Sequence, residues 1–196
     1  DSKTPGYTEH VARPPGNGWD PILDFSGVFD GQCYEIRDLD SSYEEDPGFV
    51  GAGLFGSVDG ATIRRVGVVD VRIRGGSNQK AGALVGVVKG DTTIERTYST
   101  GYWVQDQSGI RGETLASGGL IGEVQENAMV IDSYSHADVR SSGSSGGLVG
   151  INHGIILRTY AIGGDIRADD YLGGLVGINY SSGYVSDSFS DSETTG

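Results

Sequence analysis

The chain has 196 residues, which is long enough for one domain with a core, and its formal net charge is −13. No apolar run is long enough to span a membrane, and no basic run suggests binding to nucleic-acid phosphates. With 34 glycines but only 5 prolines, the composition also excludes a collagen-like or linker sequence.

The acidic residues far outnumber the lysines. The chain contains 27 Asp and Glu, whereas its lysines are only Lys3, Lys80 and Lys89. This balance is typical of proteins that work in strong salt, where about 1 M salt shortens the Debye length to about 3 Å. We therefore consider a halophilic source, against the alternative of an ordinary, well-solvated acidic surface.

The first 50 residues do not share the repeat that follows them. We expect residues 1–24 to form an N-terminal cap and residues 25–50 to form a first, atypical coil, because the ends of a repeat stack must hide an open sheet edge. The single cysteine, Cys33, excludes an intrachain disulfide and is expected to be a small buried side chain.

An acidic cluster follows this first coil. Asp38, Asp40, Glu44, Glu45 and Asp46 are candidate calcium ligands, because hard oxygen donors suit that ion. The cluster departs from the EF-hand pattern, since a tyrosine stands where that loop needs glycine. A solvated acidic loop is the alternative interpretation.

From residue 52 onward a five-residue phrase returns five times. Its central leucines, 27 to 36 residues apart, are Leu54, Leu84, Leu120, Leu148 and Leu175. The full phrases are Ala52-Gly53-Leu54-Phe55-Gly56, Gly82-Ala83-Leu84-Val85-Gly86, Gly118-Gly119-Leu120-Ile121-Gly122, Gly146-Gly147-Leu148-Val149-Gly150 and Gly173-Gly174-Leu175-Val176-Gly177. A period of this length is typical of a repeat architecture.

Each phrase begins a series of short strand-like runs. These runs hold four to six residues, are rich in β-branched and aromatic types, and are bounded by Gly, Ser, Asn and Asp. No helical apolar stripe appears. We therefore predict an all-β, right-handed parallel β-solenoid over residues 25–196. It should have about six coils, starting near residues 25, 52, 82, 118, 146 and 173, each about 4.8 Å above the last.

The repeat also predicts which side chains share a column. The leucines should point inward, and the glycines should stand at corners, where positive φ and close backbone approach favour them. An aromatic column consists of Tyr98, Tyr134, Tyr160 and Phe189. The alternation that continues from Gly67, in the same column, favours an inward direction. The outward alternative would form an exposed binding stripe.

The longest step, between Leu84 and Leu120, contains an inserted segment at 104–117. The candidate binding residues in and beside it are Tyr102, Trp103, Gln105, Asp106, Gln107 and Arg111. Aromatic rings beside amides and a carboxylate can stack on a sugar or dock a protein. A tryptophan that covers the core under a long loop is the alternative.

The phrase, its glycine turn and the Ile-x-x-Ser/Thr-Tyr run resemble the GLUG-motif repeat family over residues 52–196. The segment Phe25 to Leu39 resembles the coil that often precedes such repeats. The sequence departs at Cys33, where glycine is more usual, and at the segment 104–117. The resemblance implies a secreted or cell-surface protein, and it supplies no catalytic residue.

No catalytic constellation is visible in the sequence. His10, His136 and His153 lack metalloprotease spacing, and no nucleophile elbow occurs. We therefore expect a non-enzymatic, extracellular structural or adhesion module, part of a larger surface protein or filament, that needs no cofactor, with calcium as the one weak candidate. The alternative is a carbohydrate-binding or carbohydrate-active domain that uses the loop face. Expected partners are a protein, a glycan or further copies of the chain, and neither nucleic acid nor a membrane interior.

Overall fold

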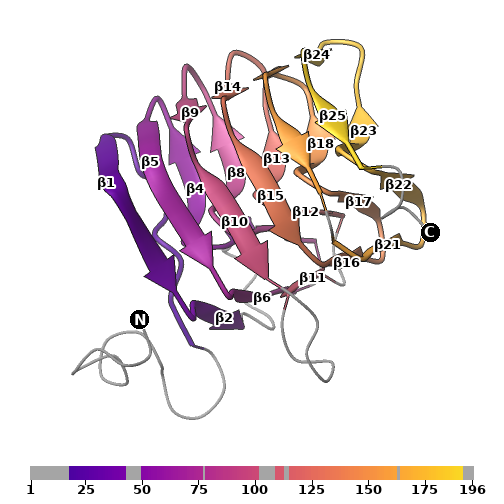
Figure 1. Ribbon diagram of the computed structural model, residues 1–196, viewed down its shortest axis with the longest axis horizontal. Coiled ribbons are helices and arrows are strands. Elements are labelled where there is room, and N and C mark those ends of the chain that lie inside the picture. The colour runs from indigo at the N-terminus through magenta and orange to yellow at the C-terminus, as the bar shows by residue number, and fades with distance from the viewer. Residues whose placement is uncertain are drawn as a thin grey trace.

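The computed structural model describes residues 18–42, 50–76, 78–101, 109–112, 115–162 and 164–191. Within these ranges the regular structure is entirely β, and the strands pair in parallel (Figure 1). Five coils begin at β3, β7, β12, β17 and β22, and β1 and β2 precede them. The predicted all-β parallel solenoid is confirmed. No helix in the described part is long and apolar enough to cross a membrane.

The first four coils pass in turn through four sheets, which we number I to IV, and the described part of the fifth passes through sheets I to III. Sheet I contains β3 (Gly51–Ala52), β7 (Lys80–Gly82), β12 (Ala116–Gly118), β17 (Ser144–Gly146) and β22 (Tyr171–Gly173). Sheet II contains β4 (Phe55–Asp59), β8 (Val85–Lys89), β13 (Ile121–Val124), β18 (Val149–Asn152) and β23 (Val176–Asn179).

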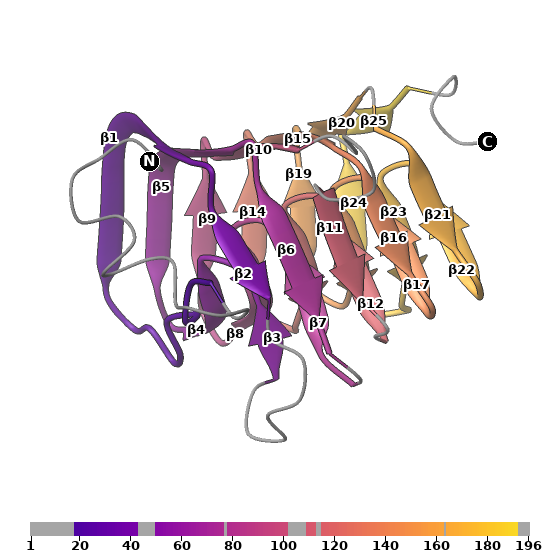
Figure 2. The ribbon, with the colours of Figure 1, turned by 90° about the horizontal axis from the view of Figure 1, so that it is seen from below.

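Sheets III and IV complete the coil. Sheet III contains β1 (Val28–Arg37), β5 (Thr62–Val69), β9 (Thr93–Glu95), β10 (Tyr98–Gly101), β14 (Met129–Ile131), β15 (Tyr134–Ala137), β19 (Ile155–Leu157), β20 (Tyr160–Ala161), β24 (Tyr184–Ser186) and β25 (Phe189–Ser190). Sheet IV contains β2 (Asp40–Ser42), β6 (Arg72–Gly75), β11 (Gly109–Gly112), β16 (Val139–Ser141) and β21 (Ile166–Ala168). Figure 2 shows the strands of sheet IV side by side along the solenoid.

The predicted leucine column lies in the core. Leu84, Leu120 and Leu148 are fully buried, Leu54 is nearly so, and Leu175 packs against the core from the last coil. Burial of one such side chain contributes roughly 1.5–3 kcal/mol. The column therefore holds successive coils in one register.

The corners of the coil are not where the glycine pattern predicts them. Among the phrase glycines of the described residues, only Gly53 has φ in the positive range. A regular corner in sheet III is instead formed by charged residues with φ between 48° and 53°, namely Arg65, Arg96, Asp132, Arg158 and Asp187. The expectation that glycine supplies the positive φ at the corners is therefore wrong for most of the phrase.

The phrase glycines are needed for close approach of backbones. A Cβ added to Gly146 would lie 2.6 Å from the amide nitrogen of Gly177 in the next coil. A Cβ added to Gly150 would lie 2.7 Å from the carbonyl oxygen of Gly122 in the preceding coil. Sheets I and II thus pack backbone against backbone, which leaves no room for a side chain.

The N-terminal end of the stack is covered. The indole Nε1 of Trp19 donates to the Leu54 carbonyl over 2.9 Å, and Ile22 pairs with Phe55 at the edge of sheet II. Next to it, β1 shows a register shift between Asp30 and Tyr34, a bulge of the kind that blunts exposed edges.

Candidate binding surfaces

The aromatic column lies on the outer face of sheet III. Tyr98, Tyr134 and Tyr160 are half-buried and Phe189 is 61% exposed, whereas their neighbours Ser99 and Ser135 are buried. Consecutive rings stack in parallel with centroids 5.0, 4.8 and 5.3 Å apart and interplanar angles of 4°, 1° and 8°. The favoured inward direction is wrong, and the outward alternative is correct.

A corner explains the error. The alternation from Gly67 through Val69 to Val71 assumes an uninterrupted strand, but Asp70 has a φ of 56°. Asp70 follows the last residue of β5 and resets the alternation, so Val68 and Val71 both point into the core. Because a one-residue slip moves every side chain to the opposite face, the pattern after Asp70 says nothing about Tyr98.

The N-terminal end of this aromatic column is held by Gly67 and Glu35. The ring of Tyr98 occupies the space in which a Cβ of Gly67 would stand, and its hydroxyl donates to the Glu35 carboxylate. Partial burial, followed by the bond to Glu35, raises the pKa of Tyr98 to about 12. The same hydrogen bond lowers the pKa of Glu35.

Charged corner residues flank the rings. Arg158 donates to Asp132 over 2.7 Å from Nε and 3.1 Å from a terminal nitrogen, and this hydrogen bonding lowers the pKa of Asp132. In the first coil the guanidinium of Arg65 bonds Asp30 and holds the pKa of that carboxyl at about 2. Within the corner column, Arg158 and Asp132 thus form an ion pair, and Arg65 pairs with Asp30 of β1.

The predicted calcium ligands do not form a described site. Asp38 lies at a corner with a φ of 56°, and Asp40 pairs with Arg72 over 3.1 Å. Glu44, Glu45 and Asp46 lie outside the described residues. Among the residues that the structure describes, no three His, Cys, Asp or Glu side chains gather in a way that could hold a metal ion.

The predicted loop site is only partly visible. Tyr102, Trp103, Gln105, Asp106 and Gln107 lie outside the described residues, whereas Arg111 belongs to β11. In sheet IV, β11 lies between β6 and β16.

The correct register reveals a feature that sequence reasoning missed. Arg74, Arg111, Arg140 and Arg167 occupy the same position in four consecutive strands of sheet IV. No basic run in the sequence marks this column, because these residues are far apart in the sequence and meet only through the stacking of coils. One signal in the sequence could have indicated the column: each of these four arginines directly follows an Ile or Val that is buried.

The cysteine prediction is also wrong. Cys33 is exposed in the bulge of β1, with a φ of 66°. Its exposure follows from the bulge, which moves the segment away from the alternation of the strand. His153, at the opposite end, stacks on Tyr180 with ring centroids 4.3 Å apart.

Comparisons with known proteins give two similarities. Over 138 residues, or 69% of its length, the chain is 33% identical to halomucin from Haloquadratum walsbyi, and the match spans 1% of that protein. A crystal structure described as a "putative immunoglobulin A1 protease" from Bacteroides ovatus covers 91% of the chain with a TM-score of 0.58 and 15% identity. The match includes 62% of that second protein's chain. No protein-family model matches the chain.

These similarities support different statements. The Bacteroides ovatus structure shares the solenoid fold, and at 15% identity it supports nothing beyond the fold. The similarity to halomucin relates the sequence to a small part of a much longer protein. Membership of the GLUG-motif repeat family stays a prediction.

Proposed function

We propose that this domain is a rigid, non-enzymatic extracellular module that provides structure or adhesion within a larger surface protein or filament. The observation that carries the proposal is the continuous stacking of side-chain columns from coil to coil, of which the parallel rings of Tyr98, Tyr134 and Tyr160 are the clearest. A repeat protein of this kind makes its contacts between neighbouring coils, so its stiffness comes from the stack.

Two further findings support a surface role. The related segment of halomucin is 1% of a very long chain, as expected for a module within a larger protein. The net charge of −13 keeps such a surface solvated. Antibody labelling of intact source cells, with and without external protease, tests the location. Labelling only after lysis would contradict it.

A second candidate function is carbohydrate binding, and the outer columns favour it. Exposed rings, such as Phe189 at 61% exposure and Tyr171 at 59%, can stack on sugars. A glycan array tests this candidate. Release of new reducing ends from a bound glycan would instead indicate a carbohydrate-active enzyme and contradict the non-enzymatic proposal.

A further inference from the structure

The arginine column of sheet IV gathers more than a third of the arginines of an acidic chain. Arg74 pairs with Arg111, Arg111 with Arg140, and Arg140 with Arg167 in the parallel register. These are four of the chain's 11 arginines, in a protein whose formal net charge is −13. The parallel register therefore sets successive arginine positions about 4.8 Å apart along the solenoid axis.

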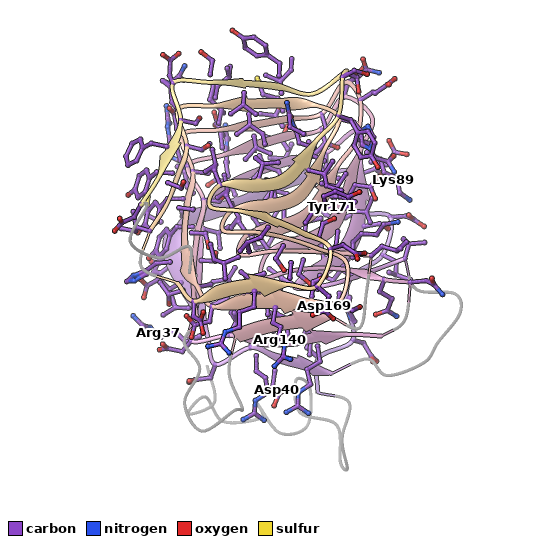
Figure 3. All side chains as sticks on the ribbon, turned by 90° about the vertical axis from the view of Figure 1, so that its right-hand side faces the viewer. Arg37, Asp40, Lys89, Arg140, Asp169 and Tyr171 are labelled. Atoms are coloured by element: carbon purple, nitrogen blue, oxygen red, sulfur yellow. The ribbon has the colours of Figure 1, made fainter. Side chains whose placement is uncertain are left out.

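The column faces solvent. The residues that precede each arginine in sheet IV, Ile73, Ile110, Val139 and Ile166, are buried at 3% exposure or less. Because successive side chains of a strand point to opposite faces, the arginine positions lie on the outer face. Arg140 and Arg167 are exposed and Arg74 is half-buried. Figure 3, seen from the C-terminal end, shows Arg140 on the same side of the coil as Asp40.

Arginines at the two ends of this surface form ion pairs with aspartates. Arg72, in the neighbouring outward column, pairs with Asp40 over 3.1 Å. Arg167 pairs with Asp165 over 2.6 Å. Among the described residues, no carboxylate forms an ion pair with Arg74 or Arg140. Like charges directly opposite each other in a sheet destabilise it, so the free protein maintains this column at a cost in stability.

We propose that the arginine column binds a linear polysaccharide whose sugars carry carboxylate or sulfate groups. The planar guanidinium donates two parallel hydrogen bonds to such oxyanions, and this geometry favours arginine over lysine. One pyranose unit advances a polysaccharide by close to the height of one coil. Neighbouring sugars of a twofold chain face opposite ways, so the acids of every second sugar can meet arginines that lie two coils apart.

Other polyanions match this row less well. An extended peptide rises about 3.3 Å per residue and returns to the same face every second residue, which gives a step of about 6.6 Å rather than about 4.8 Å. Duplex DNA carries one charge per about 1.7 Å along a winding surface, so it would bring many unpaired phosphates close to an acidic protein. The inference rests on the second proposed function and names its ligand class.

The test measures binding of the whole 196-residue protein to immobilised polysaccharides. Polygalacturonate presents carboxylates, dextran sulfate presents sulfates, and unmodified dextran presents neither. We expect binding to at least one acidic polymer and none to dextran. Arg140→Gln should weaken that binding about tenfold or more, because a charge-assisted bidentate contact is lost. Arg140→Lys should recover only part of it, since lysine keeps the charge without the fork.

Arg158→Gln is the matched control, because it removes the same charge from an exposed corner of sheet III. It should leave binding unchanged. An equal effect of the two variants, or no effect of Arg140→Gln, would overturn the assignment to the column. Equal affinity for polyglutamate or duplex DNA would overturn the assignment to polysaccharides.

A stability measurement provides an independent readout. If the stacked charges oppose folding, Arg140→Gln should raise the urea midpoint of the free protein while it lowers affinity. A variant that merely misfolds would lower both. Binding of neutral glycans alone would contradict this inference and leave the second proposed function standing. Failure of every glycan to bind would contradict both.

Discussion

At the scale of single residues, the glycines of the repeated phrase act through the space that they leave empty. Gly146 shows this best, because a Cβ at this position would meet the backbone of its own coil and of the next. Neither backbone can move without breaking the parallel ladder. The phrase therefore fixes how closely sheets I and II pack.

Gly146→Ala should destabilise the protein by several kcal/mol, because overpacking against backbone cannot be relieved by a rotamer change. Gly60→Ala is the control, since nothing lies within 4 Å of its added Cβ although its φ is 62°. That control should cost only about 1–2 kcal/mol of backbone strain. Urea midpoints of the two variants test the prediction, and equal losses would contradict it.

The Tyr98–Glu35 pair gives the outer face a pH dependence. The raised pKa of Tyr98 means that its contribution to stability is present below the ordinary value of about 10 and is lost as the pH rises towards about 12. The lowered pKa of Glu35 means that its contribution is present above about 4.3 and is lost as the pH falls through the folded value.

Glu35→Gln should lower the pKa of Tyr98 but leave it above the ordinary value, because burial is the larger cause of the shift. Phenolate absorbance measured against pH, as the difference from Tyr98→Phe, isolates this one tyrosine. An unchanged pKa in Glu35→Gln would show that the hydrogen bond to Glu35 has no part in the shift.

At the scale of elements, the outward columns were the hardest part to predict. The inward leucines follow from the repeated phrase alone. The direction of the Tyr98 side chain depends on the corner at Asp70, which no local sequence pattern indicates. The column of Arg74, Arg111 and Arg140 depends on where the long second coil re-enters sheet IV. Both are hard to predict because register in a solenoid is a property of neighbouring coils, whereas sequence patterns report only neighbouring residues.

The stacked rings should stabilise the outer face of sheet III. Tyr134 lies between two parallel rings, so Tyr134→Ala removes two stacking contacts, each worth about 0.5–1.5 kcal/mol beyond the buried area. Tyr184→Ala is the control, because that ring is 58% exposed and no ring among the described residues stacks on it. We expect a larger loss of stability and of near-ultraviolet circular dichroism from Tyr134→Ala. Similar spectra for the two variants would contradict a stacked column.

At the scale of the whole molecule, the charge of −13 predicts a strong salt dependence. Raising the salt from about 0.1 M to about 1 M shortens the Debye length from about 10 Å to about 3 Å, which screens the repulsion among the carboxylates. The unfolding midpoint should therefore rise with sodium chloride. Sucrose at equal osmolality is the control for solute exclusion. Greater stability at low salt would contradict the halophilic hypothesis.

At this scale, the outward side-chain columns of a rigid solenoid bind a polysaccharide and do not cleave it. The most direct test incubates the protein with polygalacturonate and dextran sulfate and measures, in the same samples, retention of the protein and release of reducing ends. The account predicts retention that depends on Arg140, with no release above that of polymer alone. New reducing ends, or no retention on either polymer, would contradict it.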